Sequence, residues 1–476
     1  STQSRSSAAS DVYKRQELAK IEAHFEQIFT VSNEKLRRVT DQFVGVLCKG
    51  LEKEGEVVPM LPTYVFGWPT GEETGKYLSL DMGGTNLRVC LVELLGKGKF
   101  ELTQSKFRIT DEQKHEDGAK LFDFCARCIK DFIETHFGSC DHLDEHLSLG
   151  FTFSYPTVQR AIDHGELIRW TKGFDNPNTE GRDCADMLRT SLKRFNVPVK
   201  LSSIINDTTG TLIASNYVDP RTKIACIFGT GCNAAYMESI GNIPKLSNLD
   251  LPADEQMVIN CEYGAFDSFE HRYLGSLRSK YDVEIDLSSN KPNQQAFEKM
   301  IAGKYLGEIY RLVLCELVYD GVLFLGQETH KIEKPYCFDT AFLSLIETDP
   351  TDELITVLGL FKYFFSLETE IEERRFFRKL AHLIGERSAR LSACGIAAII
   401  KKMNYVGKDC VVGVDGSLYS KYPHFSERLH QALEDILGPD GRKILTRQAE
   451  DGSGAGSAVI AAMTKNRKES QKYVHL

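Results

Sequence analysis

The sequence predicts an α/β protein made of two related lobes with a cleft between them. Its 476 residues exceed what a single hydrophobic core usually serves. Two glycine turns, Gly83-Gly84-Thr85-Asn86 and Gly229-Thr230-Gly231-Cys232-Asn233, each join two apolar strands of similar design. A unit repeated over so long a distance is typical of duplicated lobes and not of a solenoid.

The spacing of apolar residues predicts the elements in order. Helical spacing over residues 18–43 predicts an amphipathic lead-in. Residues 77–92 and 224–237 each predict a strand, a glycine turn and a second strand. A third glycine-rich stretch, residues 451–458, runs into an apolar helical segment. Residues 1–16 lack such a pattern, and we expect a disordered or foreign tail there.

The division into lobes follows from these elements. Because no long linker rich in Pro or Ser interrupts the chain, we expect the lobes to pack together and to hinge at a few crossing points. We assign residues 62–206 and 458–476 to a small lobe, and residues 17–61 and 207–457 to a large lobe.

Composition excludes several classes of protein. A formal net charge of −9 disfavours nucleic-acid binding, and the longest apolar run, Ala393 to Ile400, is too short to span a membrane. Thirteen scattered cysteines without a secretory signal favour reduced thiols and a cytoplasmic location. The close pair Cys125 and Cys128 lacks the further ligands of a zinc site and is better explained as part of an apolar helix face.

The glycine turns favour phosphate binding, since backbone N–H groups without a Cβ beside them can converge on an anion. Asp81 and Arg88 flank the first turn and would add a carboxylate for Mg²⁺ and a positive charge. Taken alone, such a turn is usually an ordinary hairpin. The sequence contains no Gly-x4-Gly-Lys-Ser/Thr motif, and the spacing in residues 452–456 does not fit a Rossmann fingerprint.

Polar side chains next to the predicted strands could bind a sugar, because Asn, Asp and Glu can each engage two hydroxyls. Each of them alone is more typical of a solvated or capping residue. The candidates are Ser154, Thr171, Lys172, Asn206, Asp207, Asn233 and Glu262.

Seven ordered motifs resemble the hexokinase family and cover roughly residues 18–463. The form resembled is the single, half-length hexokinase, and most closely the fungal variety. The motifs are Leu80-Asp81-Met82-Gly83-Gly84-Thr85-Asn86-Leu87-Arg88, Leu149-Gly150-Phe151-Thr152-Phe153-Ser154-Tyr155-Pro156, Trp170-Thr171-Lys172-Gly173-Phe174, Ile205-Asn206-Asp207-Thr208-Thr209-Gly210-Thr211-Leu212, Gly229-Thr230-Gly231-Cys232-Asn233-Ala234, Asn260-Cys261-Glu262-Tyr263-Gly264-Ala265-Phe266 and Asp451-Gly452-Ser453-Gly454-Ala455-Gly456.

The resemblance implies a two-lobed ATPase fold of the actin and Hsp70 kind, with duplicated ribonuclease H-like lobes that close on the sugar. It also implies two sets of site residues. The hexose would be held by Ser154, Thr171, Lys172, Asn206, Asp207, Asn233, Glu262, Gln295 and Glu298. Mg-ATP would face Asp81, Gly83, Gly84, Thr85, Asn86, Arg88, Gly229, Thr230, Gly231, Ser417, Gly452, Ser453 and Gly454.

The implied reaction is transfer of the γ-phosphoryl group of Mg-ATP to the 6-hydroxyl of glucose or another hexose, the first step of glycolysis. Asp207 would be the general base, Lys172 would offset developing charge, and Asp81 would orient Mg²⁺ through water. We expect a monomer or homodimer whose lobes close when sugar binds. Tyr263, Ser417 and Ala455 stand where many members have Trp, Thr and Lys, which affects nucleotide affinity more than the reaction.

Two alternatives remain open. An ATP-binding chaperone or filament module would share the phosphate turns but has no use for residues 170–174 or Glu262. A catalytically inactive sugar sensor would keep the sugar ligands and typically lose Asp207 or a phosphate turn, and the sequence retains both.

Overall fold

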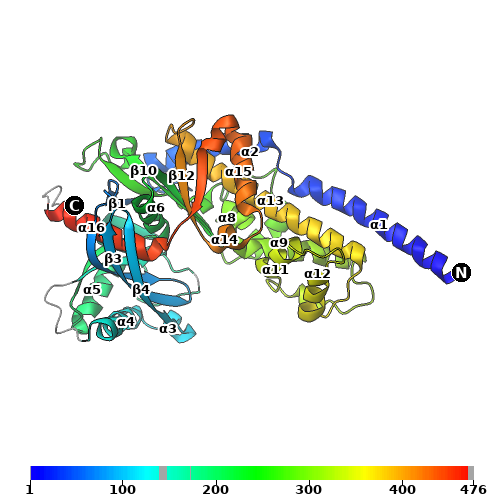
Figure 1. Ribbon diagram of the computed structural model, residues 1–476, viewed down its shortest axis with the longest axis horizontal. Coiled ribbons are helices and arrows are strands. Elements are labelled where there is room, and N and C mark those ends of the chain that lie inside the picture. Colours follow the sequence, from blue (N-terminus) through cyan, green and yellow to red (C-terminus); the bar gives the residue numbers. More distant parts are fainter. Residues whose placement is uncertain (1, 139–146, 172, 470–476) are drawn as a thin grey trace.

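The computed structural model describes residues 2–138, 147–171 and 173–469. Lys172, a predicted sugar ligand and catalytic residue, lies outside the described residues. Within the described part, two mixed β-sheets with helices around them form the two lobes (Figure 1). The predicted α/β class with two lobes is confirmed.

The small lobe is built on a five-stranded sheet in which three neighbouring strands run parallel. Because parallel strands end at the same edge, the residues that follow β2, β5 and β8 lie near one another. The strand order is β4 (Lys99–Arg108), β3 (Asn86–Gly96), β2 (Thr74–Met82), β5 (Leu147–Phe153) and β8 (Val199–Ile205).

The large lobe is built on a six-stranded sheet. Its strands β9, β12 and β13 are parallel, so they too end at a common edge. The order is β1 (Leu61–Phe66), β11 (Gln256–Asn260), β10 (Cys232–Ser239), β9 (Thr222–Phe228), β12 (Cys410–Asp415) and β13 (Ile444–Gln448).

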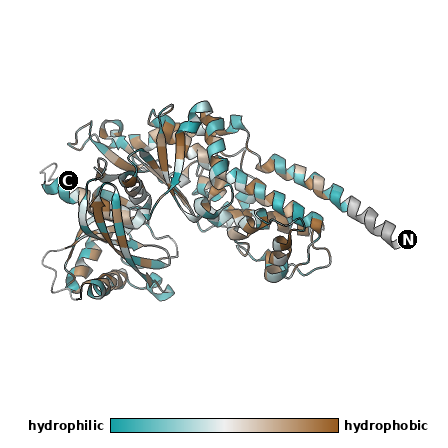
Figure 2. Cartoon of the chain, viewed as in Figure 1, coloured by the Kyte–Doolittle hydropathy of each residue, from teal (hydrophilic) through white to brown (hydrophobic). Residues whose placement is uncertain are grey.

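Both predicted hairpins are confirmed. β2 pairs antiparallel with β3, and Asp81 stands opposite Arg88 in the ladder. β9 pairs antiparallel with β10 in the same way. Figure 2 shows apolar residues concentrated along the central strands, as expected for strands covered by helices or by the other lobe.

Helices cover the outer faces of both sheets. The small lobe carries α3 (Asp111–His115), α4 (Gly118–Phe137) and α5 (Cys184–Arg194), with a short hairpin of β6 (Thr157–Ala161) and β7 (His164–Leu167). Cys125 and Cys128 are buried on α4, which confirms that they belong to an apolar helix face.

The large lobe carries most of the helices, and none of the described helices is long and apolar enough to cross a membrane. They are α1 (Thr2–Phe29), α2 (Asn33–Glu52), α7 (Lys280–Ser288), α8 (Ala296–Ile301), α9 (Gly303–Tyr319), α10 (His330–Glu333), α11 (Thr340–Glu347), α12 (Ile355–Leu360), a π-helical turn η5 (Phe361–Phe365), α13 (Ile371–Lys402), α14 (Ser417–Lys421) and α15 (Phe425–Leu437). Short 3₁₀ turns are η2 (Ile240–Asn242), η3 (Pro244–Leu246), η4 (Tyr263–Ala265) and η6 (Gly438–Lys443).

Two helices, α6 (Asp207–Val218) and α16 (Gly452–Glu469), join the lobes. They share one buried apolar cluster with residues of both sheets, for example Val92 of β3 and Val258 of β11. The packing is close, since a Cβ at Gly456 would lie 2.0 Å from the carbonyl oxygen of Gly210. The glycines at 452, 454 and 456 therefore lie inside the first turns of α16, and not in a loop before a helix that begins near residue 459.

The sequence predicts a disordered or foreign tail over residues 1–16. In the structure, α1 is helical from Thr2. This helix projects away from the body at its N-terminal end (Figure 1). Its other end is anchored, because Phe25 is buried and Lys14 Nζ lies 2.9 Å from both Glu370 and Glu373 of the large lobe. Once a helix is nucleated, each further residue adds a hydrogen bond at low cost.

The predicted lobe boundaries also need two corrections. β1 belongs to the six-stranded sheet, so the chain first crosses between sheets after Phe66 and not at residue 62. The predicted boundary at residue 458 falls inside the continuous helix α16, which packs on both lobes. Short strands such as β1 give too weak a pattern to show which sheet they join.

Candidate active site

The first glycine turn carries an ionic network that ties the small-lobe sheet to α16. Arg88 Nη2 lies 3.1 Å from Asp81 Oδ2 and 2.6 Å from Asp451 Oδ1. It donates to Ser453 Oγ at 2.6 Å, and that hydroxyl donates to Asp81 Oδ2 at 2.7 Å. Three predicted nucleotide-site residues, Asp81, Arg88 and Ser453, are thus brought into direct contact.

The rest of that turn is held open by backbone hydrogen bonds. Gly83 N donates to the carbonyl oxygen of Asn86, and the Tyr155 hydroxyl donates to that of Gly83. Thr85 and Asn86 are exposed at the tip, where Asn86 Nδ2 donates to Thr85 Oγ1. Gly84 lies between Gly83 and Thr85, so the loop offers backbone and hydroxyl groups to a ligand.

Asp207 is the first residue of α6, directly after β8. The preceding Asn206 caps the helix by accepting a hydrogen bond from Thr208 N. Asp207 Oδ1 accepts from the same N–H at 2.8 Å and lies 3.2 Å from Thr208 Oγ1. These bonds fix the carboxylate of Asp207 at the edge of the sheet where β2 also ends.

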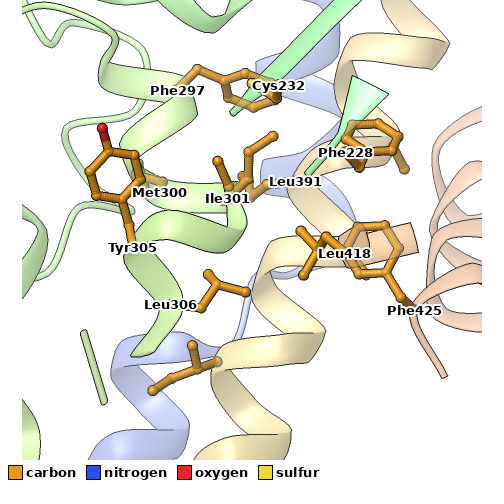
Figure 3. Packing of buried hydrophobic residues seen from close by; sticks show 14 of the residues in the cluster. Phe228, Cys232, Phe297, Met300, Ile301, Tyr305, Leu306, Leu391, Leu418 and Phe425 are labelled. Atoms are coloured by element: carbon orange, nitrogen blue, oxygen red, sulfur yellow. The ribbon is translucent and has the colours of Figure 1, made fainter. Parts of the chain in front are cut away.

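The second glycine turn adjoins the start of α14. A Cβ at Gly229 would lie 3.7 Å from Ser417 N, and Gly416 has a φ of +113° and no room for a Cβ beside Phe228. A side chain at position 416 would therefore be strained and would push the turns apart. The buried core beneath them includes Phe228 and Leu418 (Figure 3).

The backbone of this turn is bound to the start of α9. Gly229 N donates to the carbonyl oxygen of Gly231, while Gly303 N and Lys304 N donate to those of Gly229 and Thr230. Thr230 itself is exposed. The turn is thus fixed in shape while its tip remains free to meet a ligand.

The third glycine segment forms the start of α16 and packs against α6, the helix that begins at Asp207. A Cβ at Gly452 would lie 2.4 Å from Thr211 Oγ1, and the Thr152 hydroxyl donates to the carbonyl oxygen of Ser453. A Cβ at Gly454 would lie closer to the Asp451 side chain than an ordinary van der Waals contact. The third glycine segment therefore packs directly against the first turns of α6.

A second polar cluster, formed by predicted sugar residues, lies at the start of β10 and the end of β11. Asn233 Nδ2 donates to Asn260 Oδ1 at 2.7 Å, and Asn260 Nδ2 donates to Glu262 Oε1 at 3.0 Å. Glu262 N donates back to Asn233 Oδ1 at 2.9 Å, with Glu262 at a φ of +52°. A closed set of bonds holds Asn233 and Glu262 beside each other.

Glu298 of α8 joins this cluster from the other side. Its Oε2 accepts from Cys232 N at 2.9 Å, and a Cβ at Gly231 would lie 2.7 Å from that oxygen. Burial raises the pKa of Glu298, while hydrogen bonds from Cys232 N and the Gln295 side chain lower it. Glu298 and Gln295 therefore connect the sugar cluster to the second glycine turn.

Two buried carboxyls in the phosphate region have raised pKa values. Burial raises the pKa of Asp81 most, and the charge of Asp207 adds to it, against the effect of Arg88. Burial likewise raises the pKa of Asp415, at the end of β12, with contributions from Asp207 and Asp451. Carboxyls from both lobes therefore share one electrostatic field around Asp207.

Ser154 and Thr171 occupy the small-lobe side. Ser154 follows the end of β5, at the same sheet edge as Asp207. Thr171 follows Trp170, whose indole Nε1 donates to the carbonyl oxygen of Asn176 at 3.2 Å. The loop that carries Thr171 is thus anchored, and contact of either residue with a hexose stays a prediction.

Sequence reasoning missed three residues of this region. Asp415 ends an apolar strand and precedes Gly-Ser, a pattern that also fits an ordinary turn. The sequence indicates Asp451 only as a member of a glycine-rich stretch, and Asn260 only as a member of a motif. Their roles depend on contacts between distant segments, which spacing in the sequence does not reveal.

Comparison with known proteins gives the same picture over nearly the whole chain. Two family models, both described as hexokinase, match residues 21–217 and 223–463. Hexokinase-1 of Schizosaccharomyces pombe is 50% identical, with 93% of this chain and 90% of that protein covered. The chain belongs to the hexokinase family.

Other hexokinases agree with this assignment. Hexokinase-2 of Saccharomyces cerevisiae is 46% identical, with 99% of this chain and 97% of that protein covered. A solved hexokinase from Schistosoma mansoni, complexed with glucose, is 34% identical with a TM-score of 0.85 and covers 94% of this chain and 99% of its own. The resemblance and the actin- and Hsp70-like fold are confirmed, and the chaperone or filament alternative is wrong.

The protein is therefore a hexokinase, an enzyme that transfers a phosphoryl group to a hexose. The network of Asp81, Arg88 and Ser453 lies among the glycine turns, and the network of Asn233, Asn260 and Glu262 consists of groups suited to sugar hydroxyls.

Proposed function

We propose that this hexokinase transfers the γ-phosphoryl group of ATP to the 6-hydroxyl of glucose, and of other hexoses that present the same hydroxyls, with Asp207 as general base. The observation that carries the proposal is the position of Asp207 at the start of α6, which packs against the third glycine segment, close enough to affect both Asp81 and Asp415 electrostatically.

The proposed reaction needs one proton transfer. The sugar's 6-oxygen attacks the γ-phosphorus, its proton passes to Asp207, and the bond from phosphorus to the β,γ-bridging oxygen breaks to release ADP. The two hydrogen bonds from Thr208 restrict Asp207, so one carboxylate oxygen is oriented before substrate arrives.

We propose that the two polar clusters divide the substrates between them. Ser154, Thr171, Lys172, Asn206, Asn233, Glu262, Gln295 and Glu298 are proposed to hold the hexose. Asp81, Gly83, Gly84, Thr85, Asn86, Arg88, Gly229, Thr230, Gly231, Ser417, Gly452, Ser453 and Gly454 are proposed to face the nucleotide. Support comes from the hydrogen-bond sets within each group.

The residues present fit a magnesium ion held mainly by the nucleotide. Among the described residues no group of three or more His, Cys, Asp or Glu side chains could form a metal cage, and Mg²⁺ typically uses one or two carboxylates plus phosphates and water. When bound, Mg²⁺ neutralises phosphate charge. Asp81 would hold it through water. Burial first, and the charge of Asp207 in addition, raise the pKa of Asp81, and a bound cation would oppose both effects.

We further infer a cytoplasmic enzyme of glycolysis that works as a monomer or homodimer. Support for a reducing compartment comes from the cysteines, which are free thiols throughout the described part of the chain.

An assay of ADP formation tests the function. Purified protein should form ADP only when ATP, Mg²⁺ and a hexose are all present, and omission of any one should reduce the rate to background. Glucose, mannose, fructose and 6-deoxyglucose are compared, and the last serves as a matched control because it lacks the accepting hydroxyl. Glucose binding without ADP formation would instead support the inactive sugar sensor.

A further inference from the structure

A side-chain hydrogen bond crosses between the lobes beside the proposed sugar site. Arg169 Nη1 donates to Gln294 Oε1 at 3.2 Å. Arg169 adjoins Trp170, which is buried in the small-lobe core, and Gln294 stands three residues before Phe297, which is buried in the large-lobe core. The bond therefore connects two different rigid bodies, and each partner is next to residues proposed to hold the hexose.

The large-lobe partner stands on a rigid support. Asp286, which is 2% exposed, lies 2.6 Å from Lys299 Nζ and accepts from Asn293 N at 3.0 Å. Lys299 Nζ also donates to the carbonyl oxygen of Lys291 at 2.8 Å. These bonds fix residues 291–293, so Gln294 cannot move far unless the start of α8, which carries Glu298, moves with it.

The small-lobe partner is equally restrained. Trp170 N donates to Glu180 Oε1 at 2.8 Å, and the indole packs at 4.9 Å from the Tyr155 ring and 5.3 Å from the Phe174 ring, measured between ring centroids. Arg169 is thus held on a segment with little freedom. A pair between two restrained segments loses less side-chain entropy than an ordinary exposed pair.

The electrostatics around the pair are also unusual. Lys291 of the large lobe has a lowered pKa, caused first by its burial and then by the positive charge of Arg169. The charges of Arg169 and Lys291 repel each other across the lobes, and the carboxylate of Glu180 partly offsets this repulsion. Like charges would push the lobes apart at this point, and the hydrogen bond to Gln294 opposes that repulsion.

We propose that Arg169 and Gln294 form a latch between the two lobes beside the proposed sugar site, which favours the arrangement in which these two segments are in contact and so sets the affinity for hexose. Both are positioning residues that act through the segments carrying Thr171 and Glu298, without touching the reacting atoms. The inference rests on the proposed function, in which the hexose binds between these segments.

The latch predicts opposite effects of two substitutions at one position. Gln294→Ala removes the acceptor, and we expect the KM for glucose to rise about three- to tenfold, the usual effect of one lost hydrogen bond. Gln294→Glu places a carboxylate opposite Arg169, and we expect the KM for glucose to fall below that of the unchanged enzyme. Added salt should weaken that gain. The KM for ATP, measured at saturating glucose, should change less than about twofold in both variants.

A double-mutant cycle separates a latch from two independent structural effects. The variant Arg169→Ala/Gln294→Ala should be no worse than the poorer single variant, because either change alone breaks the bond. Stopped-flow Trp fluorescence should show faster glucose dissociation in the single variants, with association little changed. Thermal unfolding serves as the folding check, and the conservative Gln294→Glu remains informative if an alanine variant is unstable.

The proposal is overturned if the two alanine effects simply add, or if Gln294→Glu raises the KM for glucose as Gln294→Ala does. Failure of the latch is distinguishable from failure of the proposed function. If only the latch fails, the unchanged enzyme phosphorylates glucose while the variants give one of the two overturning results. If the proposed function fails, the unchanged enzyme forms no ADP with any hexose.

Discussion

At the scale of single residues, the sugar cluster explains why a carboxylate is needed at position 262. Glu262 is oriented by Asn260 and Asn233, and we propose that its side chain accepts a hydrogen bond from a hexose hydroxyl. Glu262→Gln keeps the shape and removes the charge. We expect the KM for glucose to rise roughly 10- to 100-fold, the cost of losing one hydrogen bond to a charged group.

Steady-state kinetics with glucose and ATP varied separately would check this prediction. Glu270→Gln, at an exposed position of the same lobe, provides the matched control and should leave both KM values unchanged. An unchanged KM for glucose in Glu262→Gln would show that Glu262 does not contact the sugar.

At the scale of elements, one histidine joins three large-lobe helices. His382 of α13 lies 3.2 Å from Glu347 of α11 and 3.1 Å from Glu386, while Arg428 of α15 also binds Glu347. Hydrogen bonds to Glu347, then to Glu386, raise the pKa of His382 to about 9, against burial and Arg428. The junction is therefore strongest when His382 is protonated.

The pH dependence of stability follows from that shift. The folded pKa lies above the ordinary 6.5, so the contribution is complete below about pH 6.5 and is lost as pH rises through about 9. Because the His382 side chain is 41% exposed, solvent screening reduces it to about 1 kcal/mol. Urea unfolding should show the difference between the parent and His382→Gln shrinking by that amount between pH 5.5 and 9.5. A constant difference between the parent and His382→Gln would contradict the prediction.

At the scale of the whole molecule, lobe closure should be visible in intrinsic fluorescence. Trp170 is packed against Phe174 beside Thr171, whereas Trp68 lies under Lys223 in the region where the chain crosses between sheets. Since the protein has only these two tryptophans, we expect glucose to change the emission through Trp170. Trp68→Phe should keep the titratable change and Trp170→Phe should lose it. The reverse pattern would show that the loop of Thr171 does not respond to sugar.

Much of this architecture could be predicted from the sequence because its strongest signals are local. The strand, glycine turn and strand around Gly83 and around Gly229 follow from alternation and turn chemistry, and both were found in the structure. The placement of β1 could not be predicted, since a six-residue strand pairs with β11 only through distant contacts. The helix from Thr2 likewise depends on anchoring of Lys14 to the distant Glu373.

In the candidate site too, local motifs could be predicted from the sequence and contacts between distant segments could not. Motifs pointed to Asp81, Arg88 and Ser453 separately, but their mutual hydrogen bonds require β2, β3 and α16 to meet. Asp415 was missed because an Asp before Gly at a strand end is also an ordinary turn residue. Only the parallel pairing of β12 with β9 brings it beside the phosphate turns.

The substitution Asp207→Asn tests most directly whether Asp207 removes the proton from the sugar hydroxyl. Asparagine keeps the size and can still accept from Thr208 N, but it cannot take up the proton. Calorimetric glucose binding and kcat are measured on the same folded preparation. We expect a glucose Kd within about threefold of the parent and a kcat lower by at least about 100-fold. A kcat within about tenfold of the parent would contradict this expectation.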